Sequence, residues 1–468
     1  MVEGRLKKIA SDTAWLAVSS FGSRILSLLL VPLYTIVLTT SEYGKIDILN
    51  TTIDLLLPFL SFVIWEAVFR FVMDKEYEPK DVFTGGIITI FFSSIILLFT
   101  YPVTEYALNS VTKYWWFYWW IFVTNGLVNL ITSFFRGIDK VNVCAVQGVI
   151  YTALFSIFNV ILLLYFKIGI CGYFTSQIIG NVVAIAYMLY IGKAYVFFSL
   201  SSFKIRTLLD MIKYSLPLVP AAVAWWVVSS IDKYMLLYMC GESANGLYAV
   251  AHKIPTILTT ITSFFISAWQ ISAVKNKDAD DSEEFMSSMY TNLIYVCVFV
   301  AFILIIISRT MTEIIFAREY FPSWNMVPGL IIGAVFSTCS GFIGAQFTAY
   351  KRSDLHFFSN IIAMFSNILF NYPLILVFGS KGAALGTMFS FFVVLIYRQY
   401  KLKLLQKVFY NEKKIYMIFA ILIVSSIIST LDLKNWMFYE IVLLMIIFSL
   451  NYYEVKILIL KLFSIKNN

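Results

Sequence analysis

The chain has 468 residues, of which 60% are hydrophobic and only 13% are charged. This composition excludes a soluble globular protein, because too little polar surface is available to cover the apolar mass. A formal net charge of +8 suits either nucleic acid or a membrane surface. The distribution of the basic residues favours the membrane, so we expect no nucleic-acid partner.

Long apolar runs dominate the chain from its first residues. Runs of about 20 apolar residues predict membrane-spanning helices, whereas a β-barrel would show segments of about 10 residues with alternating polarity. We therefore predict an all-α polytopic membrane protein with about fourteen transmembrane helices. An arrangement of about twelve spans with two re-entrant or interfacial pieces is the alternative. The predicted spans are 14–38, 46–72, 82–103, 114–135, 143–166, 170–198, 214–239, 247–273, 286–308, 326–350, 355–378, 382–397, 415–431 and 436–453.

The basic residues predict the orientation. With the N-terminus inside, most of the 35 Lys and Arg residues fall in connections on the inner side. This is the positive-inside pattern, so both termini are predicted to be cytoplasmic. A smaller number fall in outer connections, and Arg24, Lys233 and Lys253 belong to neither side, because they fall within apolar segments.

An internal repeat is indicated by three short similarities that occur in the same order in both halves. Short turns rich in Ser, Asn and Gly also recur by chance, which is the alternative. The repeat predicts two six-helix lobes, at residues 1–200 and 201–410, followed by two extra helices and a basic tail at 411–468. The matching pairs of segments are 38–44 with 239–246, 136–139 with 352–354, and 157–172 with 369–386.

The segment from Tyr214 to Lys253 places charges inside apolar runs. Asp232 and Lys233 are adjacent and point about 100° apart on a helix, so each needs a partner from another helix. Lys253 faces either an anionic substrate or, by snorkelling, the membrane surface. His252 is either a proton-coupling or charge-pairing group or a polar packing residue.

Two further groups of charges lie in the first two spans. Arg24 lies about 15 Å along the first span, at 1.5 Å per residue, and faces either a cavity or a partner on a neighbouring helix. Glu66 and Arg70 are four residues apart and form either a gating element or a neutral pair. Asp54, Glu66 and Asp232 are the candidates for binding a coupling ion.

No enzyme is predicted. The sequence contains no GxxxxGK phosphate loop and no convincing catalytic constellation. Its five Cys and two His residues do not form a metal-binding pattern. The short connections also argue against a membrane polymerase or glycosyltransferase. The three cations within the spans imply an anionic substrate, since Arg and Lys bind phosphate and carboxylate.

Over about residues 10–410 the chain resembles the Wzx-type polysaccharide flippases of the multidrug/oligosaccharidyl-lipid/polysaccharide exporter superfamily. The most specific similarity runs from the YSLPLVP motif at 214–220, through Asp232 and Lys233, to GLYAVAHK at 246–253. Shorter ones are TSEYG at 40–44, Phe69 with Arg70, and FRGIDK at 135–140.

The resemblance implies that two lobes form an inverted V and move an undecaprenyl-diphosphate-linked oligosaccharide to the outer leaflet of a bacterial cytoplasmic membrane. Arg24 matches an arginine in the first span of the related lipid II flippases. Coupling to H⁺ or Na⁺ is common in the superfamily, and no other cofactor is expected. Pathway partners would be a polymerase and glycosyltransferases. The alternative is a cation-coupled multidrug exporter of the same superfamily or, less in keeping with the short loops, a polymerase.

Overall fold

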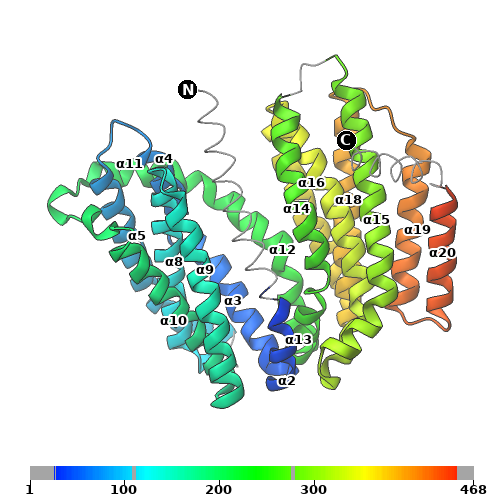
Figure 1. The fold of residues 1–468 in the computed structure, drawn as a ribbon, viewed down its shortest axis with the longest axis horizontal. Coiled ribbons are helices and arrows are strands. Elements are labelled where there is room, and N and C mark those ends of the chain that lie inside the picture. Colours follow the sequence, from blue (N-terminus) through cyan, green and yellow to red (C-terminus); the bar gives the residue numbers. More distant parts are fainter. Residues whose placement is uncertain (1–25, 27, 108–111, 276–279, 451–468) are drawn as a thin grey trace, which may run out of the picture. The chain divides into compact units, whose positions relative to one another are not determined.

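The computed structural model describes residue 26 and residues 28–107, 112–275 and 280–450. Within these residues the chain is all-helical, with no strand, as predicted (Figure 1). The contacts divide it into two compact units, Met1–Ser230 and Ile231–Asn468. The boundary falls inside helix α12, which runs from Val219 to Cys240. The predicted limits of the two lobes and of the C-terminal pair stay predictions.

The helices of the two units follow one another with short connections. In the first unit they are α2 (Val31–Val37), α3 (Thr40–Leu60), α4 (Ile64–Val72), α5 (Pro79–Phe99), α6 (Tyr101–Ala107), α8 (Trp115–Gly137), α9 (Val141–Asn159), the π-helix η1 (Val160–Tyr165), α10 (Gly169–Tyr190), η2 (Ala194–Phe197), η3 (Leu200–Ser202), α11 (Ile205–Ser215) and η4 (Leu216–Leu218). After α12 come α13 (Glu242–Ala251), α14 (Pro255–Lys275), α15 (Ser282–Ile315), η5 (Arg318–Met326), α16 (Val327–Ala349), α17 (Ser353–Phe378), α18 (Ser380–Lys403), α19 (Glu412–Thr430) and α20 (Trp436–Leu450).

The number of membrane-spanning helices is smaller than the prediction when judged by length and composition. Among the described residues, 10 helices are long and apolar enough to cross a membrane, or 11 if the bent pair α3 and α4 is one span. Most of the first predicted span, 14–38, lies outside the described residues. The prediction of about fourteen spans is therefore not confirmed as a count, although a helix covers at least part of every predicted span from 46–72 onward.

The second predicted span, 46–72, is broken rather than continuous. Helices α3 and α4 meet at an angle of 53°. At the break, Phe62 and Val63 adopt left-handed backbone angles, with φ of 56° and 54°. Pro58 precedes the break and lacks a backbone N–H, which weakens the helix at this point. Glu66 and Arg70 therefore lie on a different helix from Asp54, contrary to the spacing predicted for one helix.

The core of the first unit forms where α4, α5 and α8 pack together. Ile64, Ala67 and Val68 recur on one face of α4 at helical spacing, and all are fully buried. Gly86 of α5 allows this close approach, since a Cβ atom there would lie 2.7 Å from Leu130 of α8. The result is a packed helical scaffold beneath the connection that leads into α11.

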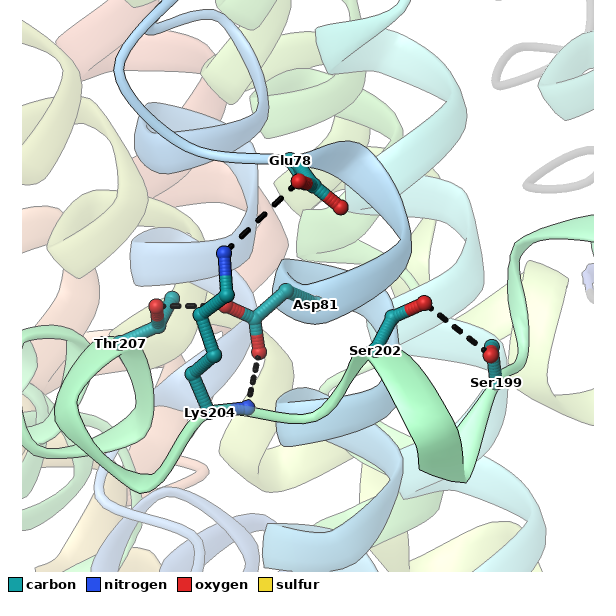
Figure 2. Close-up of polar contacts among 6 residues, drawn as sticks. All are labelled: Glu78, Asp81, Ser199, Ser202, Lys204 and Thr207. Carbon is teal, nitrogen blue, oxygen red and sulfur yellow. Dashed lines mark hydrogen bonds and ion pairs between the residues drawn. The ribbon is translucent and has the colours of Figure 1, made fainter.

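That connection is fastened to the start of α5 by a small polar network (Figure 2). The Asp81 carboxylate accepts hydrogen bonds from the backbone N–H of Lys204, at 2.8 Å, and from the hydroxyl of Thr207, at 2.6 Å. Asp81 thereby satisfies an N–H group at the first turn of α11, as an N-capping side chain does. The Lys204 ammonium also lies 3.7 Å from Glu78.

Helix α16 is the centre of the second unit. Nearly all of its side chains are buried, and it packs against α14, α15, α18 and α19. Gly329 and Gly333 permit close contact with α18, because a Cβ atom at these positions would lie 3.1 Å from Ala384 and 3.4 Å from Met388. This contact fixes the position of α18, which carries a residue of the candidate site.

The last two described helices, α19 and α20, are joined by a buried carboxyl group. They lie side by side at the orange and red end of the chain (Figure 1). Glu440 of α20 is fully buried and accepts hydrogen bonds from Ser425, at 2.7 Å, and Ser429, at 2.6 Å, both of α19. A polar group in an apolar helix pair is costly unless it is satisfied in this way.

Candidate functional site

The second unit contains a buried carboxylate that is held by three helices. Asp232 of α12 is only 2% exposed. Its Oδ2 accepts hydrogen bonds from the Tyr248 hydroxyl of α13, at 2.6 Å, and the Thr387 hydroxyl of α18, at 3.0 Å. The two hydroxyl oxygens are 3.2 Å apart. Asp232, Tyr248 and Thr387 form the carboxylate cluster, and the prediction that Asp232 has partners on other helices is confirmed.

A further buried oxygen belongs to Asn371 of α17. The Asn371 side-chain N–H donates to the carbonyl oxygen and Oδ1 of Asn367, at 2.9 and 3.0 Å. Its own Oδ1 accepts no hydrogen bond from any described residue. This oxygen would lie 2.6 Å from a Cβ atom on Gly386, the residue before Thr387. A buried acceptor that lacks a donor, beside the residue that precedes Thr387 of the carboxylate cluster, is an oxygen that could serve as a cation ligand.

The chemistry of this region is that of an oxygen-only site. A carboxylate, two hydroxyls and an amide carbonyl are ligands for hard cations such as Na⁺, and a carboxylate also accepts a proton. The Asp232 Oδ1 already accepts the backbone N–H of Lys233 at 3.0 Å. Oδ2 is therefore the oxygen that faces the hydroxyl groups, and its charge is the one that a bound cation or proton would neutralise.

The other predicted residues of the second unit lie near the cluster in the chain. Lys233 is half-buried and directly follows Asp232. His252 is half-buried, and its ring packs edge-on against the ring of Tyr248, with centroids 4.6 Å apart. His252 and Lys253 lie in a three-residue break between α13 and α14, just before Pro255. The predicted span 247–273 is therefore two helices, since the proline begins a new one.

The predicted residues of the first unit do not form one group. Asp54 is exposed on α3, while Glu66 and Arg70 follow the break and lie on α4. Arg70 forms its ion pair with Asp74, at 3.9 Å, rather than with Glu66. Arg24 lies outside the described residues, so its predicted place in a cationic site stays a prediction.

Arg398 is a buried cation that the sequence did not indicate. The span was predicted to end at residue 397, which left Arg398 among the basic residues of the inner side. Helix α18 instead continues to Lys403. The Arg398 guanidinium donates to Ser359 (2.9 Å), the Ser340 carbonyl (2.8 Å) and Asn360 (3.1 Å). It thereby ties α16, α17 and α18 together through neutral partners.

Tyr248, Thr387 and Asn371 were also not singled out as site residues. Tyr248 belongs to the GLYAVAHK similarity, and Asn371 and Gly386 belong to the predicted repeat. The sequence patterns therefore included these residues but did not indicate what they bind or contact. The role depends on contacts between helices, and the contact of Thr387 with Asp232 joins residues 155 positions apart. A single sequence does not encode those contacts in any local pattern.

Comparison with known proteins supports both the family and the fold. The family described as polysaccharide biosynthesis protein matches residues 9–270. The lipid II flippase MurJ, in an inward closed conformation, superposes with a TM-score of 0.70 at 14% identity, covering 96% of this chain and 99% of that one.

Multidrug transporters share the fold as well. An inward-facing multidrug resistance MATE family transporter of the MOP superfamily superposes with a TM-score of 0.69 at 14% identity, covering 82% of this chain and 95% of that one. A mutant of the Vibrio cholerae MATE transporter VcmN superposes with a TM-score of 0.53 at 12% identity, covering 84% of this chain and 98% of that one. No curated protein matches. The predicted resemblance and the multi-pass membrane fold are confirmed, and none of these three structures is of an enzyme.

Proposed function

Because the chain belongs to the polysaccharide biosynthesis protein family, we propose that it is a flippase for an undecaprenyl-diphosphate-linked oligosaccharide repeat unit. The substrate moves from the inner to the outer leaflet of a bacterial cytoplasmic membrane by alternating access, with both termini of the protein in the cytoplasm. The likeness to a lipid II flippase over 96% of the chain supports a lipid-linked substrate. Glycosyltransferases and a polymerase would supply the substrate and consume the product.

The diphosphate is assigned to the cations in the apolar segments. Lys233, Lys253 and Arg24 supply positive charge, and Lys and Arg bind phosphate well when water is excluded. Lys233 is half-buried in α12, directly after the buried Asp232. A multidrug exporter, the alternative with the same fold, would carry cationic drugs and would gain nothing from these lysines.

The carboxylate cluster is the single observation that carries the proposal of ion coupling. Asp232 is buried, is held by hydroxyl groups from two other helices, and lies next to Lys233 in sequence. A monovalent cation, Na⁺ or H⁺, would be held by Asp232 with Thr387 and Asn371. Its charge would neutralise Asp232 and so strengthen the positive field of Lys233 toward a diphosphate. Ion binding and substrate binding would thereby be linked through two adjacent residues.

The substrate assignment is tested with Lys233→Ala in a strain that lacks its polysaccharide flippase. We expect at least about a ten-fold loss of complementation at unchanged protein level, because truncating one partner of a buried charge pair costs several kcal/mol. Lys407→Ala, which removes an exposed lysine, is the matched control. Full complementation by Lys233→Ala would contradict a diphosphate substrate. So would a variant that loses drug resistance while it still complements the missing flippase. Arg24→Ala is expected to act like Lys233→Ala.

The coupling assignment is tested with Asp232→Asn in proteoliposomes that contain a fluorescent lipid-linked oligosaccharide. Transport is driven in separate arms by a Na⁺ gradient and a pH gradient. We expect one gradient to stimulate the wild-type protein and the variant to lose that stimulation, with a rate lower by about 100-fold. Asp432→Asn, which removes an exposed carboxylate between α19 and α20, is the matched control. Equal stimulation of the variant and the wild type would remove Asp232 from coupling, without affecting the substrate assignment.

A further inference from the structure

The connection between α10 and α12, residues 191–218, has one face fixed to the protein. Thr207, Leu208 and Met211 of α11 are buried against α4 and α5. The Asp81 network holds the start of this helix (Figure 2). Thr84 of α5 adds a hydrogen bond from the Ser199 backbone N–H, at 3.0 Å. The inward side of the connection is therefore fully used in packing.

A second face of α11 is apolar and uncovered. Ile205 is 61% exposed and Leu209 is 58% exposed, although both are large aliphatic side chains. They lie one turn apart, at about 100° per residue, and so share a face beside the buried one. Ile191 and Leu200 are also exposed in the same connection, and Tyr190 is exposed at the end of α10. The candidate span Gly169–Tyr190 ends at Tyr190, so exposed apolar residues begin where that span ends.

A third face of α11 is basic. Arg206 and Lys213 are exposed and lie about two turns apart on the same side, next to the apolar face. Lys193 is exposed earlier in the connection. Within the part of the chain that the structure describes, no carboxylate lies within 4 Å of these three cations. The one acid of the helix, Asp210, instead accepts a hydrogen bond from Tyr77, at 3.5 Å.

We propose that α11, which opens the continuous helical run Ile205–Cys240, lies at the membrane surface and binds the headgroups of anionic phospholipids. Its apolar face, Ile205 and Leu209, enters the boundary of the acyl chains, and Arg206, Lys213 and Lys193 bind headgroup phosphates. A helix with adjoining apolar and basic faces is suited to a lipid surface. A protein partner is disfavoured because the exposed apolar residues continue from a span that is already in the bilayer. The lipids that bind here are bilayer components and need not be the transported substrate.

The test uses the full chain, reconstituted in nanodiscs of phosphatidylethanolamine with increasing fractions of phosphatidylglycerol. After release into detergent, the phosphatidylglycerol retained by the protein is counted by native mass spectrometry. Each cation near a membrane surface contributes about a five-fold factor in binding. We therefore expect the ratio of retained phosphatidylglycerol to retained phosphatidylethanolamine to be at least about ten-fold lower for the double variant R206Q/K213Q than for the wild type.

The matched control is K407Q/K413Q, which removes two exposed lysines, one in the connection between α18 and α19 and one in the first turn of α19. It is expected to retain phosphatidylglycerol like the wild type. An unchanged melting temperature of R206Q/K213Q would show that the Asp81 network still holds α11. Equal loss in both double variants, no loss in R206Q/K213Q, or full displacement of the lipid by inorganic phosphate would overturn the proposal. Because the measurement is lipid retention, its result is independent of which substrate is transported.

Discussion

Asn159 in the first unit and Asn371 in the second occupy corresponding positions in the repeat and are built alike. Both side chains are fully buried. Each donates to the carbonyl four residues earlier, Asn159 to Phe155 at 2.7 Å and Asn371 to Asn367 at 2.9 Å. In both residues Oδ1 accepts no hydrogen bond from the described part of the chain. The same buried amide has therefore been retained in both halves.

The surroundings of these two amides differ. After Asn159 the helix changes to the π-helix η1, and the atoms nearest to a Cβ on Gly172, the counterpart of Gly386 in the predicted repeat, belong to Ile168, Leu162 and Leu163. After Asn371 the α-helix continues, and Gly386 faces Asn371 itself, next to the carboxylate cluster. The comparison teaches that two positions paired by the predicted repeat hold the same buried amide in two different settings. In the second setting the amide lies against Gly386, the residue before Thr387 of the carboxylate cluster, and we propose its oxygen as a ligand for the coupling cation.

The largest effect is expected when this amide is removed from the second unit. Asn371→Ala removes a carbonyl oxygen that we assign to the coupling cation, and loss of one ligand typically costs about 10-fold to 100-fold in affinity. The cation concentration that gives half-maximal transport should rise by that factor in proteoliposomes. Asn159→Ala is the matched control and should leave that concentration unchanged. If the two variants weakened cation dependence equally, the assignment to the second unit alone would be wrong.

The extent to which this arrangement was predictable differs between fold and site. Apolar runs of about 20 residues determine the membrane helices, because each run must bury its backbone polar groups within itself. Breaks at Ser61 to Val63 and before Pro255 were harder to predict, since an apolar run with one proline reads as a single span.

Site prediction depended on how far apart the partners lie in sequence. Asp232 was found because a carboxylate in an apolar run is unusual by itself. Thr387 and Asn371 are ordinary polar residues in spans. Their place in the candidate site is evident only from the contact of Thr387 with Asp232 of α12 and of Asn371 with Gly386 of α18. Arg398 was missed because its helix extends beyond the predicted end. Contacts of this kind depend on how helices pack, which a single sequence specifies only indirectly.

A smaller effect is expected from adding a methyl group at the two corresponding glycines. Gly386→Ala would place Cβ 2.6 Å from Oδ1 of Asn371, so the amide or α18 must move. We expect a loss of about 1 to 3 kcal/mol in stability, as for overpacking, together with weaker cation dependence. Gly172→Ala would meet a flexible Ile168 side chain at 3.0 Å and should cost less. The melting temperatures of the two variants, measured with and without Na⁺, test this difference. Equal shifts in melting temperature for both variants would argue against a special fit at Gly386.

The smallest effect is expected in the polar network that stays within the first unit. Asn181 of α10 donates to Thr124 at 3.0 Å and to Asn125 at 2.7 Å, both on α8. Hydrogen bonds between membrane helices contribute about 0.6 to 2 kcal/mol, so Asn181→Ala should lower the melting temperature slightly. A double-mutant cycle with Asn125→Ala isolates the shared bond. Since no buried carboxylate among the described residues hydrogen-bonds to this network, cation dependence should not change. A change as large as that of Asn371→Ala would instead place part of the coupling in the first unit.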